Sequence, residues 1–352
     1  MKKIQWEDII FFKGLDNPNL ANELMTKLKE YAGVHPLVGH INYHRFTDGE
    51  LDDVFADYEN IEGKTVVFFE CLKDEQTMLR FLQLCWAMKK QYKVKYIVAV
   101  ISFFHYRRQD RPEKKQEIHR NLWLAEMLKV NGVDYVIVAT PHSDRMQKNC
   151  ENVNLQFRSV DSSEAFASVL RPVIPENGDS ERAVVYSPDE GSVSRAVTLA
   201  IFLGIGVLFN LKDRPPNNET TMALADEKKI AEIIERVEKE YGFSDIQYAT
   251  ENLIRGVHII MAEDELDTGG TLNKQGVMLN ESGAVAVHAV ITHPVCSDGW
   301  KRKVFYKDPF AKIIMMDTIF RSAEQRTGGR VHDVSVAGLL ASTIFRVLQK
   351  VM

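Results

Sequence analysis

Runs of β-branched and aromatic residues alternate along the chain with segments of helical periodicity. Residues 65–70 (TVVFFE), 96–104 and 133–140 predict buried strands, because nearly all their side chains are apolar. Between these runs, apolar residues recur at helical spacing: Met78, Leu79, Leu82 and Ala87 in one segment, and Ile118, Leu122, Ala125 and Leu128 in the next. This order predicts a parallel sheet covered by helices on both faces.

The alternation begins again after a polar stretch at residues 175–182, which predicts a linker. The later strands are expected at residues 183–186, 207–210, 257–262, 284–291 and 312–316, and the helices at 192–203, at 226–241 and from about 271. Residues 334–352 predict a strand end and an amphipathic helix. We therefore expect an α/β protein with domains at 1–160 and 161–335, and a C-terminal helix at 336–352 that packs back on the first domain.

Composition excludes several functional classes. A net charge of −5 and a pI of about 6.1 favour neither a nucleic-acid nor a membrane partner. The polar N-terminus predicts no signal peptide, and the longest apolar run, 196–209, is too short to span a bilayer. The four cysteines are scattered and predict reduced thiols: Cys71, Cys85, Cys150 and Cys296. We expect a cytoplasmic protein.

The segment 259–272, IIMAEDELDTGGTL, has the clearest chemistry. A strand runs into acidic residues, and a glycine-threonine turn then opens a helix; the residues are Glu263, Asp264, Asp267, Thr268, Gly269, Gly270 and Thr271. Glycines let the backbone approach an anion, and free N–H groups at a helix start bind phosphate. The carboxylates can accept hydrogen bonds from ribose hydroxyls and can bind Mg²⁺ through water. We expect a ribose-phosphate site here.

This segment resembles the phosphoribosyl diphosphate (PRPP) binding loop of type I phosphoribosyltransferase folds. Other short segments occur in a fixed order: RFTDGE at 45–50, YRRQDR at 106–111, ATPHS at 139–143, YSPDEGSVSR at 186–195, NLKDRP at 210–215, AVITHPV at 289–295 and MDTI at 316–319. Together they resemble the PRPP synthetase (ribose-phosphate diphosphokinase) family from about residue 40 to the C-terminus. A phosphoribosyltransferase would not need the first domain, so it ranks well below a synthetase.

The resemblance implies two tandem phosphoribosyltransferase-like domains, MgATP as a substrate, and a homo-oligomer built from dimers, up to a hexamer. Phe46, Asp48 and Glu50 would recognise adenine from one subunit. Arg108 and Gln109 would meet ATP from the adjoining subunit. His142 and Asp189 would hold Mg²⁺, and Asp189 would also approach the ribose.

Lys212 and Arg214 match the family's Lys-x-Arg at the start of a flexible catalytic loop. Two cations so spaced can reach the transferring diphosphate as charge develops, which phosphoryl transfer requires. The polar stretch after Pro215 fits a lid that orders on binding. No residue suggests itself as a general base, so positioning and electrostatics would supply the catalysis.

The chain departs from the family at several positions. The paired aspartates of the ribose loop are here Glu263 and Asp264, and Thr140 stands where the family commonly has Asp. These changes leave three hypotheses open: PRPP synthesis from ribose 5-phosphate, the same transfer to a larger 5-phosphoribosyl acceptor such as ADP-ribose, and a non-catalytic regulatory relative. The retained His142, Asp189 and Lys-x-Arg pair argue against the third.

Overall fold

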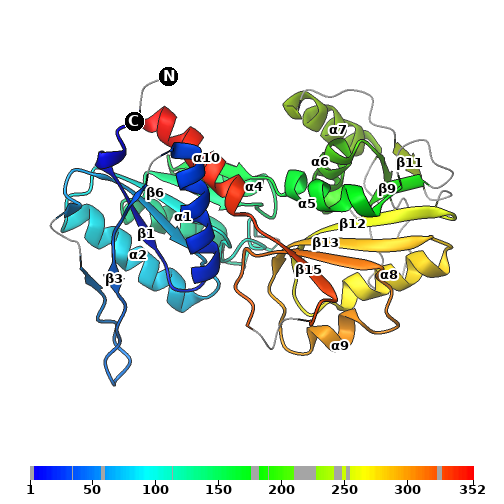
Figure 1. Cartoon of the computed structure of the whole chain (residues 1–352), viewed down its shortest axis with the longest axis horizontal. Coiled ribbons are helices and arrows are strands. Elements are labelled where there is room, and N and C mark those ends of the chain that lie inside the picture. The colour runs from blue at the N-terminus through cyan, green and yellow to red at the C-terminus, as the bar shows by residue number, and fades with distance from the viewer. Residues whose placement is uncertain are drawn as a thin grey trace. The chain divides into compact units, whose positions relative to one another are not determined.

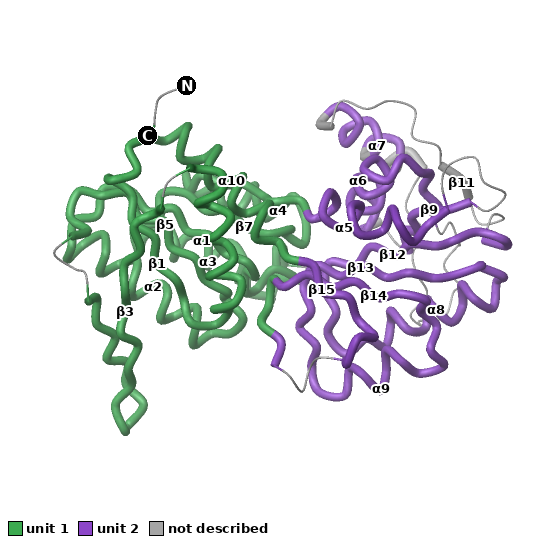
Figure 2. The backbone as a smooth tube through the Cα atoms, viewed as in Figure 1, with its two compact units in different colours: residues 1–161, 318–320, 335–352 green, residues 162–317, 321–334 purple. Residues whose placement is uncertain are grey.

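The computed structural model describes residues 4–33, 35–56, 60–112, 114–175, 182–188, 190–209, 227–241, 248–250, 254–322 and 327–352. The chain divides into two compact units (Figure 2). Unit 1 comprises residues 1–161, 318–320 and 335–352, and unit 2 comprises residues 162–317 and 321–334. Each unit is a mainly parallel sheet flanked by helices, so the predicted fold class is confirmed.

The sheet of unit 1 has the strand order β2-β1-β5-β6-β7-β8, with parallel neighbours throughout. Its strands are β1 (Ile9–Lys13), β2 (Leu37–Val38), β5 (Thr65–Glu70), β6 (Tyr96–Ile101), β7 (Tyr135–Ala139) and β8 (Gln156–Val160). Every residue of β5 is buried, as expected of a central strand covered on both faces. The chain order reverses between β1 and β5, where open α/β sheets place ligands.

The helices of unit 1 are α1 (Pro18–Ala32), α2 (Glu75–Lys90), α3 (Arg120–Val130), α4 (Arg145–Asn152) and α10 (Ala337–Val351). Side-chain caps start two of them: Asn17 accepts the Leu20 N–H, and Asp74 accepts the Thr77 N–H. The C-terminal helix α10 packs beside α1 (Figure 1). The last helix of the sequence thus completes the unit that contains the first.

An antiparallel ribbon extends from unit 1 (Figure 1). It is formed by β3 (Ile41–Asn42) and β4 (Val54–Phe55), with an isolated bridge between Arg45 and Leu51 nearer its tip. The tip is the segment RFTDGE. The ribbon is anchored where the Phe55 ring meets the Phe12 ring of the core at 5.7 Å.

The sheet of unit 2 has the order β11-β10-β9-β12-β13-β14-β15. Its strands are β9 (Arg182–Ser187), β10 (Gly206–Phe209), β11 (Tyr248–Thr250), β12 (Val257–Leu266), β13 (Ala286–Pro294), β14 (Lys312–Met316) and β15 (Val331–Val334). Figure 1 shows α5 (Ser163–Leu170), α6 (Val193–Leu203) and α7 (Glu227–Tyr241) on one face of it, and α8 (Gly270–Glu281) and α9 (Trp300–Val304) on the other. No helix in the described ranges combines the length and apolarity that a membrane span needs.

Two details of the predicted elements are wrong. Strand β12 does not stop at residue 262 but continues to Leu266, because Glu263 and Glu265 pair with Ile291 and His293 of β13. Two residues assigned to apolar helix faces are exposed: Leu79 at 53% and Ile118 at 62%. Leu79 lies on the outer side of α2, and Ile118 precedes the first residue of α3.

Candidate functional site

The turn between β12 and α8 requires a glycine at residue 269. Gly269 is the N-cap of α8 and has φ of 78°, in the left-handed region that side chains disfavour. A Cβ at this position would also lie 2.2 Å from Cγ2 of Val304. Gly269 is buried and holds the turn against α9. Its first role is therefore to shape the loop.

Gly270, the first residue of α8, has a different environment. A Cβ added here would meet no atom within 4 Å, so the space beside the backbone is open. No side chain caps α8, because its N-cap is Gly269. The first N–H groups of a helix have no partner within the helix, and they carry the positive end of its dipole. This loop has the features of a phosphate site built from backbone donors.

An arginine from α6 fixes one of the acids beside the loop. The Arg195 guanidinium lies 3.7 Å from the Asp264 carboxylate and donates at 3.1 Å to the Ala262 carbonyl. The side chains of Arg195 and Asp264 are only 13% and 14% exposed. Glu263 and Asp267 are half-buried on the same strand end. The structure therefore brings the predicted acids and the phosphate turn together.

Other predicted residues cannot be placed. Asp189, Lys212 and Arg214 lie outside the described residues. On either side of Asp189 in the sequence, the hydroxyls of Ser187 and Ser192 form a hydrogen bond at 2.8 Å. This bond links the end of β9 to the start of α6.

The predicted adenine-contacting residues share the tip of the β3–β4 ribbon. The Phe46 N–H donates to the Glu50 carbonyl at 2.8 Å, and the Asp48 carboxylate accepts from the Glu50 N–H at 3.0 Å. The Phe46 side chain is 49% exposed. The His44 ring of the same ribbon meets the Phe46 ring edge-on, with 6.0 Å between centroids. The exposed part of the Phe46 ring offers a stacking surface.

Arg108, Gln109 and His142 lie on the loops that follow β6 and β7. Arg108 and Gln109 are exposed, and the Gln109 side-chain oxygen accepts from Arg120 at 3.0 Å. His142 is half-buried. These loops are joined by a neighbouring contact that sequence reasoning did not find: the buried Arg107 donates to the Thr140 carbonyl at 3.4 Å.

Thr140, which stands where the family commonly has Asp, has a structural contact in this chain. Its hydroxyl donates to the Val160 carbonyl of β8 at 3.1 Å, and its side chain is buried. Asp110, also buried, accepts a hydrogen bond from the Ser143 hydroxyl. The Thr140 hydroxyl therefore links the loop after β7 to strand β8.

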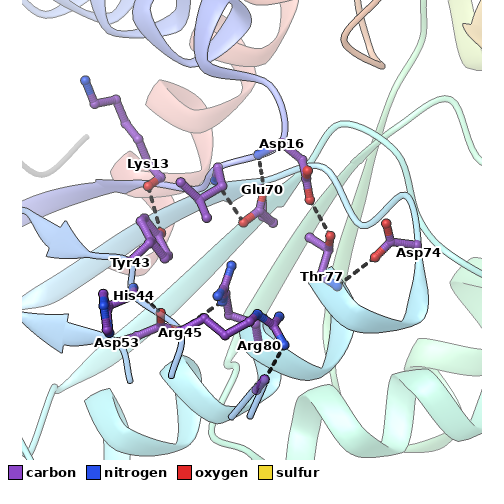
Figure 3. Close-up of polar contacts among 12 residues, drawn as sticks. Lys13, Asp16, Tyr43, His44, Arg45, Asp53, Glu70, Asp74, Thr77 and Arg80 are labelled. Atoms are coloured by element: carbon purple, nitrogen blue, oxygen red, sulfur yellow. Dashed lines mark hydrogen bonds and ion pairs between the residues drawn. The ribbon is translucent and has the colours of Figure 1, made fainter. Parts of the chain in front are cut away.

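A second polar cluster fills the carboxyl end of the sheet in unit 1, between β1 and β5 (Figure 3). The Glu70 carboxylate accepts from the backbone N–H groups of Cys71 at 2.9 Å and Leu15 at 3.3 Å. A Cβ at Gly14 would lie 2.1 Å from the carboxyl carbon, so the loop closes tightly over it. Burial raises the pKa of Glu70 to about 7. The protein's own carboxyl group occupies this switch point, whereas the turn in unit 2 is open.

Comparison with known proteins shows what this chain is similar to. A family model for the N-terminal domain of ribose phosphate pyrophosphokinase matches residues 9–132. The chain is 29% identical over 348 residues to the ribose-phosphate pyrophosphokinase of Ralstonia nicotianae, covering 97% of this chain and 96% of the relative. It is 28% identical over 344 residues to that of Haemophilus influenzae, covering 97% and 96%. Over nearly its whole length, the chain is similar to ribose-phosphate pyrophosphokinases.

The ribose-phosphate pyrophosphokinase family takes its name from a diphosphotransferase, so the predicted family and enzyme class are confirmed. A solved phosphoribosylpyrophosphate synthetase from Mycobacterium smegmatis has the same fold, with a TM-score of 0.75 and 23% identity over 97% of this chain and 99% of that chain. The roles of the individual site residues remain predictions.

Proposed function

We propose that the protein transfers the β,γ-diphosphate of MgATP to the C1 hydroxyl of a ribose 5-phosphate unit, releasing AMP. The observation that carries this proposal is the open amino end of α8 at Gly270, beside an acid braced by Arg195. The backbone donors suit the 5-phosphate, and the fixed carboxylate suits the ribose hydroxyls.

The acceptor would be held at both ends of its ribose 5-phosphate unit. N–H groups at residues 269–271 and the hydroxyls of Thr268 and Thr271 bind the phosphate, and the Asp267 carboxylate lies on the ribose side. Asp264 and Glu263 accept hydrogen bonds from ribose hydroxyls. Because Arg195 already neutralises Asp264, the carboxylate keeps its position before the acceptor arrives.

ATP would enter with Mg²⁺. Among the described residues, no group of three or more His, Cys, Asp or Glu side chains could hold a metal ion. Mg²⁺ keeps several waters and binds through substrate phosphates and one or two protein ligands. His142 and Asp189 are proposed as those ligands.

The adenine would bind to Phe46, Asp48 and Glu50 of one subunit, with Arg108 and Gln109 supplied by a neighbour. The exposure of Phe46 at the ribbon tip supports a site that a second copy completes. We therefore propose a homo-oligomer built from dimers as the active form.

The chemistry is an in-line displacement. The C1 oxygen bonds to the β-phosphorus, the bond from that phosphorus to the α,β-bridging oxygen breaks, AMP leaves with that oxygen, and the hydroxyl proton passes to solvent. Lys212 and Arg214 would stabilise the charge on the moving diphosphate. Positioning of the two substrates can supply about 7–11 kcal/mol, so we assign no general base.

The direct test is to incubate the protein with MgATP and ribose 5-phosphate or ADP-ribose, and to measure AMP release and product mass. The proposal expects a product heavier by one diphosphate. If neither acceptor leads to AMP release, a non-catalytic relative would be favoured. In the same assay, Lys212→Ala should lower kcat far more than it changes ATP binding; equal losses would contradict the role given to Lys212.

A further inference from the structure

A groove of about 580 Å³ runs along the outer side of α8, beginning at the phosphate turn. From α8 it is lined by Gly270, Lys274, Met278 and Glu281, which recur at helical spacing and so share one face. Its volume falls within the roughly 300–1,000 Å³ usual for small-molecule sites. Gly270 belongs both to the proposed phosphate turn and to the groove, so the two are continuous.

The opposite wall runs alongside α8 in the same direction. Asn273 Nδ2 donates to the carbonyls of Val304 at 2.9 Å and Tyr306 at 2.6 Å, and Asn280 Nδ2 donates to the Pro309 carbonyl at 2.7 Å. Val304 also packs against Gly269. The residues just before Val304 therefore lie at the phosphate end, and those after Tyr306 lie at the far end.

Charge is distributed unevenly along the groove. Lys274, Arg302 and Lys303 lie toward the phosphate end, and among the described residues none of them forms an ion pair. At the far end, Lys307 lies 3.5 Å from the Glu281 carboxylate, so that charge is balanced. The groove thus offers uncompensated positive charge beside the turn.

The middle of the groove is apolar. Val277 and Met278 are half-buried there, and the Tyr306 side chain is 63% exposed across from them. An exposed tyrosine ring beside a methionine side chain suits a flat, aromatic group. Positive charge followed by an apolar wall fits a phosphate that carries a nucleoside.

We propose that the acceptor extends beyond its 5-phosphate, and that this groove binds a second phosphate and the nucleoside attached to it. The acceptor is then a nucleoside diphosphate joined to ribose, of which ADP-ribose is the probe. A bare ribose 5-phosphate would fill only the turn and leave the groove empty. The proposal rests on the proposed function, because the same C1 hydroxyl attacks the same β-phosphorus of MgATP.

The test compares kcat/KM for ADP-ribose with kcat/KM for ribose 5-phosphate, both with MgATP. Tyr306→Ala and Lys303→Glu should each lower the ratio of the two values about tenfold, because each removes a contact to the extension only. Tyr31→Ala and Lys148→Glu, exposed positions in unit 1, are the matched controls and should leave the ratio unchanged. Calorimetry without ATP should show the same loss for ADP-ribose binding.

The outcomes separate the two proposals. If ribose 5-phosphate reacts while ADP-ribose does not, or if the groove variants leave the ratio unchanged, the extended acceptor is wrong and the diphosphate transfer stands. If neither acceptor yields AMP, the proposed function fails. ADP that binds the groove without competing with ribose 5-phosphate or ADP-ribose would make it an effector site and also overturn the extended acceptor.

Discussion

The guanidinium of Arg195 lies 3.7 Å from the carboxylate of Asp264 and so joins α6 to the end of β12. The same guanidinium donates to the Ala262 carbonyl, which fixes its plane against the strand. Both side chains are largely buried. A carboxylate held in this way cannot swing away when the acceptor is absent, so the ribose side of the site is preorganised.

Replacing Arg195 with Met should disturb both binding and folding. Asp264 would lose its contact with the Arg195 guanidinium, and loss of a largely buried charged contact costs on the order of 1–3 kcal/mol of unfolding free energy. The KM for the acceptor should rise at least about tenfold, because the Asp264 carboxylate would no longer be held in position by Arg195. Arg346→Met on the exposed side of α10 is the matched control. Unchanged acceptor KM in Arg195→Met would show that Asp264 does not bind the ribose.

The adjacent glycines of the turn should respond differently to alanine. Gly269→Ala combines a left-handed φ with a clash against Val304 and should lower the free energy of unfolding by about 1–3 kcal/mol. Gly270→Ala has ordinary backbone angles and open space, so it should fold normally. Its methyl group would stand where the phosphate approaches, and the acceptor KM should rise about tenfold or more. Thermal unfolding and acceptor titration of both variants check this; normal KM in Gly270→Ala would place the phosphate elsewhere.

Much of the fold could be predicted from local pattern. Residues 65–70 and 312–316 are strands with the predicted bounds, because long β-branched runs bury both faces. The N-terminal strand β1 was not predicted, although its sequence IIFFK is equally apolar. Short apolar runs do not distinguish strands from buried helix segments. The second half of β12 was also not predicted, since its acidic residues become strand only by pairing with β13.

In the candidate site too, some residues could be predicted from local sequence and others could not. Asp264 and the glycine turn are adjacent in sequence, so their chemistry is visible in the segment itself. Arg195 is distant from them, and its position inside a helix says nothing about which acid it meets. The groove along α8 depends on Asn273 holding the segment after α9, a tertiary contact with no local signal.

Phe46 should contribute to ATP binding without contributing to stability. Its ring is 49% exposed at the ribbon tip, so Phe46→Ala should change the free energy of unfolding by less than about 0.5 kcal/mol. The KM for ATP should rise about tenfold, the loss expected for a stacking contact of roughly 1 kcal/mol or more. Phe320→Ala, at a similarly exposed position, is the control. Unchanged ATP KM would remove the ribbon from the adenine site.

Glu70 should make unit 1 less stable as pH rises. Burial raises its pKa from 4.5 to about 7, so the folded state binds a proton that the unfolded state has released. The contribution of protonated Glu70 to the free energy of unfolding is complete below pH 4.5 and is lost as pH rises through about 7. The change in unfolding free energy is on the order of 3 kcal/mol. Glu70→Gln should remove this slope. Urea unfolding across pH 5–8, followed by the signal of unit 1, measures it; equal slopes in both proteins would contradict it.

His288 should have the opposite effect in unit 2. Burial, with His258 and Lys312 nearby, lowers its pKa from 6.5 to about 4. The His288 ring stacks on that of His258 with 5.9 Å between centroids, and among the described residues neither of its nitrogens finds a hydrogen-bond partner. The unfolded state therefore binds the proton more readily between pH 6.5 and about 4, and stability falls as pH drops through that range.

His288→Phe keeps a ring against His258 and removes the titrating group. The variant should lose the acid-side decline in the unfolding free energy of unit 2, on the order of 3 kcal/mol for the wild type. His332→Phe, an exposed histidine on β15, is the matched control and should retain the decline. Because Glu70 and His288 lie in different units, two resolved transitions would shift in opposite directions with pH. A decline that persists in His288→Phe would assign the acid sensitivity to another group.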